Sequence, residues 1–279
     1  MNNLIKNDEA NKLISSKIEN NIPINVGRVG RNELQVCIGY NTNTSIESFW
    51  LTNLQNNAGV YGSEKDILEF CEAYIGSISK ADLHVYWDMG EEFKQLQTHF
   101  FRSYAKDTPL LENRSVEPFH FQDPWSKQLK DKNVLVVNPL GESIYNQYRN
   151  RDLLWDNKDI LPEFNLTVYQ NVQSIGNNGP HSGWSESFNI MKKEISELEF
   201  DIALLGCGAY GMPLCTFIKE QMNKTAIYVG GGLQILFGIK GKRWDTHDEI
   251  SVMYNENWVR PLPHEIPTKK DLVENGCYW

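Results

Sequence analysis

Short apolar runs alternate with amphipathic stretches along most of this chain. The clearest amphipathic stretch is 64–79, whose apolar residues recur at helical spacing and which follows a capping Ser63. Further helical patterns occupy 33–39, 92–104, 142–150 and 209–221, and apolar runs of strand length occupy 24–29, 81–87, 133–138, 166–170, 200–205 and 225–229. Strands that alternate with helices form a parallel sheet covered on both faces. The pattern therefore predicts an α/β fold: a Rossmann-like, mostly parallel sheet with helices on both faces.

Two segments interrupt the alternation. Residues 1–20 carry scattered charge and are interpreted as a polar leader without a predicted element. At Asp123-Pro124-Trp125, an aspartate cap and a proline at the first helical position predict a short helix that ends near Lys130.

Composition narrows the class of protein. The 279 residues suffice for one domain over 1–279, or for two associated halves, 1–130 and 131–279. The formal net charge of -9 argues against a general nucleic-acid binder. Without a signal-peptide pattern or a membrane-spanning run, we expect a cytoplasmic protein with at most peripheral membrane contact. Dispersed cysteines and histidines without paired spacing predict no metal site.

Three glycines follow the apolar run 200–205. Gly206, Gly208 and Gly211 let the backbone turn sharply before a helix whose first N–H groups attract anions. Their spacing matches a dinucleotide fingerprint, which also needs an acidic residue at the end of the next strand. That strand runs instead into Gly230-Gly231-Gly232. The turn therefore indicates a nucleotide or phosphate ligand more strongly than NAD.

Other candidate residues also follow predicted strands, and the carboxyl ends of parallel strands share one sheet edge. The loops 28–33, 138–142, 173–176, 206–211 and 230–232 are rich in glycine or small polar residues, and we expect one site across them. We expect Asn138 and Tyr210 to belong to this site. Glu142 binds a sugar hydroxyl or only favours its helix dipole. Ser174 binds a phosphate or sugar, or only forms a turn.

Basic residues supply the charge that a phosphate needs. Arg28 and Arg31 can each hold phosphate oxygens through a bidentate fork, and Glu33 can act as a base or ligand. The alternative is an exposed turn with an Arg–Glu ion pair. Lys240, Lys242 and Arg243 form the densest positive charge, which either clamps a leaving diphosphate or is a solvated turn.

The string Asn25-Val-Gly-Arg-Val-Gly-Arg-Asn-Glu-Leu34 resembles the N-terminal motif Arg-x-Gly-Asp-x-Glu-Leu of bacterial glycosyltransferases with the GT-D fold. A further resemblance, to relatives from surface-polysaccharide gene clusters, rests on Ala58-Gly-Val-Tyr61, Asp123-Pro-Trp125, Gly206-Cys-Gly-Ala-Tyr-Gly211, Gly230-Gly-Gly-Leu-Gln234, Phe237-Gly-Ile-Lys-Gly-Lys-Arg-Trp244 and Gly276-Cys-Tyr-Trp279. Together these motifs extend over nearly the whole chain.

The resemblance implies roles for the first motif. The family's Asp and Glu hold a divalent ion and the nucleotide-sugar donor. This chain keeps Arg28, Gly30, Glu33 and Leu34 but has Arg31 in place of the Asp. A guanidinium does not ligate a cation, although it can neutralise a diphosphate. We therefore expect a transferase that depends on Mn²⁺ or Mg²⁺ weakly or not at all.

The sequence favours a glycosyltransferase that moves a sugar from a nucleotide-sugar donor onto a bacterial surface glycan or lipid-linked precursor. Glu33, Arg28 and Arg31 are its predicted catalytic residues. If the chain has two halves, we expect 1–130 to bind the acceptor and 131–279 to bind the nucleotide. Two alternatives stay open: an enzyme that uses NAD or S-adenosylmethionine, and a non-catalytic subunit that binds a nucleotide-sugar.

Overall fold

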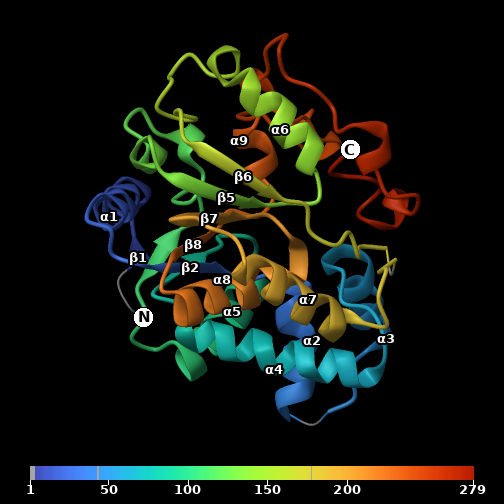
Figure 1. Cartoon of the computed structure of the whole chain (residues 1–279). Coiled ribbons are helices and arrows are strands. Elements are labelled where there is room, and N and C mark those ends of the chain that lie inside the picture. Colours follow the sequence, from blue (N-terminus) through green and yellow to red (C-terminus); the bar gives the residue numbers. More distant parts are fainter. Residues whose placement is uncertain (1–3, 43, 177) are drawn as a thin grey trace.

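The computed structural model describes residues 4–42, 44–176 and 178–279. Within these residues eight strands form one sheet, in which all neighbouring strands are parallel, in the order β1-β4-β3-β2-β8-β7-β5-β6 (Figure 1). The strands are β1 (Leu4–Ile5), β2 (Asn25–Arg28), β3 (Leu83–Tyr86), β4 (Leu110–Glu112), β5 (Asn133–Val137), β6 (Asn165–Tyr169), β7 (Ile202–Leu205) and β8 (Thr225–Tyr228). The predicted α/β fold is confirmed, and the sheet is parallel throughout.

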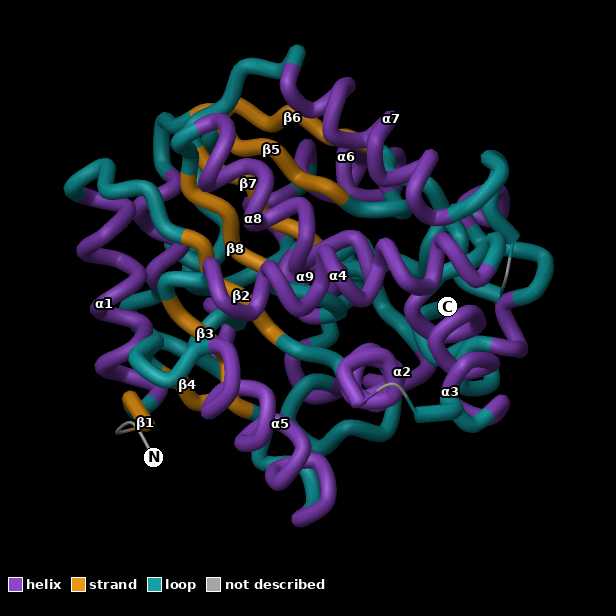
Figure 2. Tube along the Cα trace, turned by 90° about the horizontal axis from the view of Figure 1, so that it is seen from below, coloured by secondary structure: helices purple, strands orange, loops and turns teal. Residues whose placement is uncertain are grey.

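Helices cover both faces of the sheet, as predicted. One face packs against α2 (Arg31–Thr42), α4 (Glu64–Lys80), α5 (Glu91–Tyr104), α7 (Trp184–Ser196) and α8 (Gly211–Met222). The other packs against α1 (Asn7–Glu19), α6 (Gly141–Arg149) and α9 (Gly232–Leu236). Figure 2 shows α4, α7 and α8 lying across the first of these faces. Each face buries its own apolar cluster, because the side chains of a strand alternate between the two faces.

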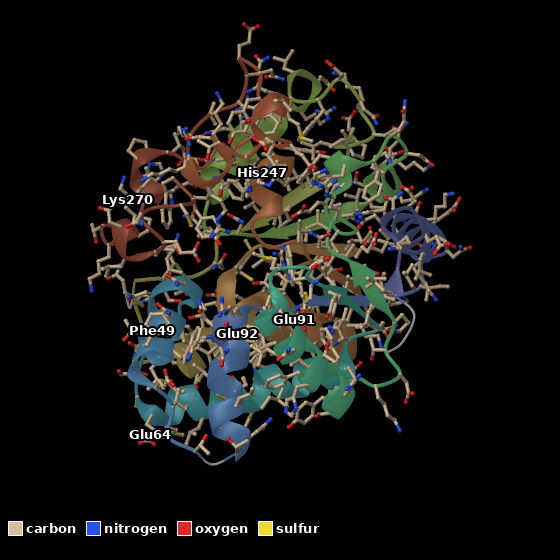
Figure 3. The ribbon with its side chains drawn as sticks, turned by 180° about the vertical axis from the view of Figure 1, so that it is seen from behind. Phe49, Glu64, Glu91, Glu92, His247 and Lys270 are labelled. Carbon is tan, nitrogen blue, oxygen red and sulfur yellow. The ribbon has the colours of Figure 1, made fainter. Side chains whose placement is uncertain are left out.

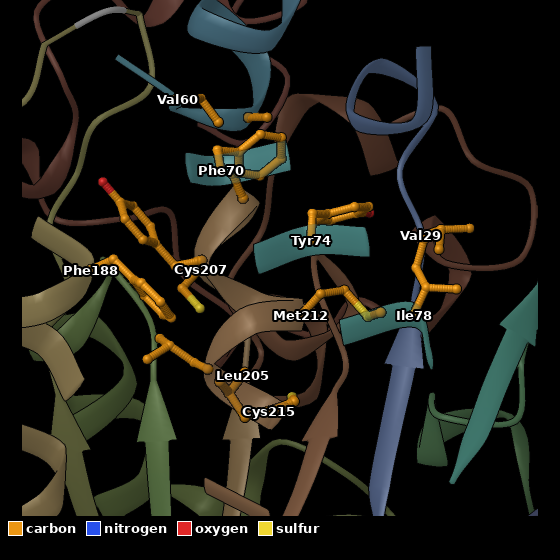
Figure 4. Packing of buried hydrophobic residues seen from close by; sticks show 14 of the residues in the cluster. Val29, Val60, Phe70, Tyr74, Ile78, Phe188, Leu205, Cys207, Met212 and Cys215 are labelled. Atoms are coloured by element: carbon orange, nitrogen blue, oxygen red, sulfur yellow. The ribbon is translucent and has the colours of Figure 1, made fainter. Parts of the chain in front are cut away.

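Helix α4 illustrates how the sequence determines an element. The predicted cap is present: Ser63 and Asp66 form a capping box, with the Ser63 N–H donating to the Asp66 carboxylate over 2.8 Å. The buried face of the helix carries Phe70 and Tyr74, which Figure 4 shows packed near Met212 of α8. The amphipathic spacing therefore gave both the start and the buried face of this helix correctly.

Two local predictions were wrong. Residues predicted as a polar leader form α1, because Ala10, Ile14 and Ile18 provide a narrow apolar stripe that packs on the sheet. Pro124 is not the first helical residue. It keeps an extended conformation with ψ of 148°, and a 3₁₀ helix of residues 125–129 begins after it. The predicted end near Lys130 is correct.

The order in which successive strands join the sheet reverses at β5, although all strands remain parallel. From β5 it crosses to β6 on one side, and it then returns to β7 on the other side of β5. In open α/β sheets such a switch point opens a crevice at the carboxyl ends of the strands. Between α2 and α4 the chain forms the helix α3 (Ser48–Asn53) and a π-helical segment (Leu54–Ala58), and Asn57 and Ala58 of that segment lie at this edge. Among the described residues no helix is both long and apolar enough to cross a membrane.

Candidate functional site

A cleft lies at the carboxyl ends of β6, β5, β7 and β8. Its walls are the loops that follow these four strands, the π-helical segment, and the side chains of Tyr278 and Trp279. Among its lining residues are seven of the predicted donor-binding residues: Asn138, Ser174, Gly206, Gly208, Tyr210, Gly230 and Gly231. The structure thus brings together segments that are far apart in the sequence.

Asn138 joins the loops at the switch point. Its side-chain Nδ2 donates to the carbonyl oxygen of Gly206 over 2.9 Å, and its Oδ1 accepts from the N–H of Leu140 over 2.9 Å. A Cβ on Gly206 would lie 2.7 Å from Asn138 Nδ2 and 2.8 Å from the Gly230 carbonyl oxygen. The glycine therefore allows the loops after β5, β7 and β8 to meet at the floor of the cleft.

The glycine turn after β7 also has a packing role. Gly208 has φ of +57°, and a Cβ there would lie 2.7 Å from the carbonyl oxygen of Ala58. The Tyr228 hydroxyl donates to the Gly208 carbonyl oxygen over 2.8 Å, and the Tyr228 ring leaves no room for a side chain at Gly211. The turn after β7 thus packs against the π-helical segment and against the Tyr228 ring. These contacts shape the cleft.

Tyr210 and Ser174 make their stacking contacts and hydrogen bonds within the protein. The Tyr210 ring stacks on Trp184 at a centroid distance of 5.6 Å. The Ser174 hydroxyl donates to the Gly59 carbonyl oxygen over 2.7 Å and lies 3.1 Å from the Tyr210 hydroxyl. Both residues fix the wall of the cleft, with their polar atoms already engaged.

Arg28 and Glu33 lie beside the cleft, at the end of β2. The Arg28 guanidinium donates to the Val229 carbonyl oxygen and lies 4.3 Å from the centroid of the Trp87 ring. A Cβ on Gly230 would lie 2.6 Å from Arg28 Nη1, so the guanidinium packs directly against a glycine that lines the cleft. This contact connects the first motif with the glycine turn after β8.

Glu33, in the first turn of α2, folds back over Gly30, where any side chain would overlap its carboxylate. Burial raises the pKa of Glu33, while the positive charge of Arg28 opposes that shift. The hydroxyl of Tyr74 accepts from the N–H of Gly30 over 2.9 Å and holds the turn in place. Glu33 and Arg28 therefore share one electrostatic environment.

Arg31 points elsewhere. Its guanidinium forms an ion pair with Glu92 at the start of α5 and lies 5.6 Å from the centroid of the Trp50 ring. Figure 3 labels Glu92 together with Phe49, which neighbours Trp50. The side chain is exposed, and its ion-pair partner is Glu92 rather than Glu33.

Two of the three basic residues after α9, Lys242 and Arg243, bind the segment 274–279. The Arg243 guanidinium forms an ion pair with Glu274 and lies 4.7 Å from the centroid of the Tyr278 ring. Lys242 Nζ donates to the Asn275 carbonyl oxygen over 3.1 Å, and Lys240 Nζ lies 5.4 Å from the Tyr254 ring centroid. Lys242 and Arg243 thus support the cleft wall from behind.

The second and third glycines after β8 also pack closely. A Cβ on Gly231 would lie 3.2 Å from the Trp244 ring and 3.3 Å from the Tyr278 ring. A Cβ on Gly232 would lie 2.8 Å from Glu117 Oε1. Gly232 is the first residue of α9 and does not line the cleft. Close packing is therefore a reason for glycine at both positions.

Glu142 lies outside the cleft and pairs with His264 Nε2 over 2.9 Å. The N-terminus of α6 is occupied by Glu265, whose carboxylate accepts from the N–H groups of Glu142 over 2.8 Å and Ser143 over 3.2 Å. Glu265 is only 5% exposed. This helix N-terminus therefore already binds an anion, and no pattern in the sequence pointed to Glu265.

Asn171, Tyr228, Gln234 and Trp279 line the cleft but were not predicted as site residues. Asn171 follows β6, so the rule that selected the strand-end loops would have included it had that loop begun at residue 171. Within the described ranges, no three His, Cys, Asp or Glu side chains gather in a way that could hold a metal ion. Weak or absent metal dependence remains a prediction.

A parallel sheet with a switch point and a cleft at its carboxyl edge defines an α/β protein of the Rossmann-like class. Residues 5–236 match the family model described as a GT-D fold-like domain. The chain therefore belongs to this family, as its motifs indicated. Searches of curated proteins and of solved structures found no significant match.

Proposed function

We propose that this protein is a cytoplasmic glycosyltransferase that moves a sugar from a nucleotide-sugar donor onto a bacterial surface glycan or a lipid-linked precursor. Membership of the GT-D-like family supports a relationship to glycosyltransferases. The observation that carries the proposal is the contact of Arg28 with Gly230, which connects a cation and the half-buried carboxylate of Glu33 to a glycine-rich cleft.

The chemistry follows from these groups. The bond between the sugar's anomeric carbon and the diphosphate oxygen breaks, and the acceptor hydroxyl oxygen forms the new bond to that carbon. Glu33 takes the hydroxyl proton, and a base whose pKa is raised by burial is better matched to this task near neutral pH. Arg28 stabilises the negative charge that develops on the leaving diphosphate. Arg31 has to leave Glu92 before it can assist.

The donor set does not fit a divalent ion. The family motif places an aspartate where this chain has the cation Arg31, and that side chain pairs with a carboxylate. We propose that transfer needs no metal ion and persists in a chelator.

The test is a thermal-shift screen against UDP-, GDP-, dTDP- and CMP-sugars, NAD and S-adenosylmethionine, with and without Mn²⁺. Selective stabilisation by one nucleotide-sugar family without metal supports the proposal, because a ligand of the folded state raises the melting temperature. A response confined to NAD or S-adenosylmethionine overturns it.

Transfer is then measured with the selected donor and a lipid-linked glycan acceptor. Glu33→Gln should reduce turnover by about 10²- to 10⁴-fold while donor binding persists. Glu91→Gln, an exposed carboxylate on α5, is the matched control and should retain full activity. Donor binding with neither hydrolysis nor transfer by the unmodified protein would instead indicate a non-catalytic subunit.

A further inference from the structure

Two polar atoms of the cleft are buried without a partner. Eight buried side-chain polar atoms of the described residues have no hydrogen-bond partner, and two of them, Asn171 Oδ1 and Trp279 Nε1, belong to residues that line the cleft. Asn171 is 5% exposed. Buried polar atoms in folded proteins are nearly always paired, and a ligand in the cleft can supply the missing partners of these two. One is an acceptor and the other is a donor.

Hydrogen bonds of their other polar groups hold Asn171 and Trp279 in place. The Nδ2 of Asn171 donates to the Val172 carbonyl oxygen over 2.8 Å, which fixes the amide orientation and leaves Oδ1 free. The carbonyl oxygen of Trp279 accepts from the N–H of Lys242 over 3.3 Å. The adjacent Tyr278 carbonyl oxygen accepts from Gln234 Nε2 over 2.8 Å. These bonds fix the Asn171 amide and the backbone at Trp279 before a ligand arrives.

The sheet order gives the cleft a direction. Asn171 follows β6, the glycine turns follow β7 and β8, and Arg28 ends β2. Four strand spacings separate β6 from β2 in the order β6-β5-β7-β8-β2, which is about 19 Å at about 4.8 Å per strand. An extended nucleotide-sugar can therefore lie along this edge, with its diphosphate at the glycine turns and its sugar near Glu33.

The lining around Asn171 favours a flat heterocycle at the β6 end. Pro139 and Leu140 after β5, and Val172 and Ile175 after β6, supply apolar surface there. Every nucleobase combines an apolar ring face with an edge that carries hydrogen-bond donors and acceptors. Ribose hydroxyls offer the same hydrogen bonds but lack such a face.

We infer that Asn171 and Trp279 recognise the nucleobase of the donor. Asn171 Oδ1 accepts a hydrogen bond from a base N–H, and Trp279 Nε1 donates one to a carbonyl oxygen or ring nitrogen of the base. This assignment rests on the proposed function and adds the orientation of the donor to it: base at β6, sugar at β2.

The experiment measures binding of UDP, ADP, GDP, CDP and inorganic pyrophosphate to the full chain by calorimetry. Asn171→Leu and Trp279→Phe should each weaken the preferred nucleoside diphosphate by about tenfold or more, because each leaves a hydrogen-bonding group of the base unpaired. Pyrophosphate affinity should stay within about twofold, since it has no base. Asn171→Asp keeps an acceptor and should recover part of the affinity. Asn146→Leu, at an exposed position of α6, is the control.

The outcomes separate the two proposals. If the unmodified protein prefers a nucleoside diphosphate over pyrophosphate and both variants keep that preference, the base assignment is wrong and the proposed function stands. If the loss in Asn171→Leu disappears with a 2′,3′-dideoxynucleotide, Asn171 binds ribose and the assignment is overturned. If no nucleotide binds better than pyrophosphate, the proposed function fails as well. Melting temperatures verify folding, and Trp279→Phe provides an independent test if Asn171→Leu does not fold.

Discussion

Replacing Glu265 should show how strongly an internal carboxylate holds the N-terminus of α6. Its carboxylate accepts from the N–H groups of Glu142 and Ser143 and from the Ser143 hydroxyl. Hydrogen bonds to a charged group contribute about 1.5–3 kcal/mol each, and an orphaned buried donor costs about 1–3 kcal/mol. We expect Glu265→Ala to lower the free energy of unfolding by about 3–5 kcal/mol, because two backbone donors lose their partner.

Urea unfolding followed by tryptophan fluorescence measures this change. Glu265→Gln keeps an acceptor but loses the charge that the helix dipole favours, so its loss should be about 1–2 kcal/mol. Glu256→Ala removes an exposed carboxylate and should stay within about 0.5 kcal/mol of the unmodified protein.

An added anion provides an independent readout. Sulfate should stabilise Glu265→Ala more than the unmodified protein, because the vacated N–H groups form an anion site that is coupled to folding. The reasoning is refuted if Glu265→Ala unfolds within about 0.5 kcal/mol of the unmodified protein. It is also refuted if sulfate stabilises the two proteins equally.

Three further predictions concern single residues. Because the folded state raises the pKa of Glu33 above its ordinary 4.5, ionisation opposes folding, so Glu33→Gln should raise the melting temperature at pH 8 and have little effect below that ordinary value. Gly208→Ala should lose more stability than Gly90→Ala in urea: both positions have positive φ, but only at Gly208 does a Cβ meet a backbone carbonyl, that of Ala58. Ser63→Ala should cost about 1 kcal/mol through the lost cap, measured in the same way, and an unchanged midpoint would contradict the capping role.

Local patterns predicted six of the eight strands and five of the nine α-helices of the described residues; α7, like α1, was not predicted. The predicted bounds of the strand 133–138 and of the helix 64–79 agree with the observed bounds within a residue or two. Long periodic or uniformly apolar segments specify their own structure. Helix α1 was not predicted because its apolar stripe contains few residues and its remaining positions are polar or charged. β4, with three residues, is too short to show a period.

The site was predictable only where strand ends reveal it. Parallel topology predicts that the loops after β5, β7 and β8 meet, so Asn138 and the glycine turns were within reach of the sequence. The partners of Arg243 and of the α6 N-terminus were not, because Glu274 lies in a turn and Glu265 in a short 3₁₀ helix, both far along the chain. A count of positive charges cannot reveal whether they face a ligand or hold another part of the protein.

The position of β2 between β3 and β8 has a consequence for synthesis. Residues 25–28 leave the ribosome early, yet one side of this strand pairs only with β8, at residues 225–228. Until then the nascent chain presents an open strand edge, a surface that favours aggregation and that chaperones bind. The hydrogen bond from Arg28 to Val229, 201 positions later, forms only at that last stage. A ribosome stalled before β8 would therefore hold a chain whose proposed active site is still unassembled.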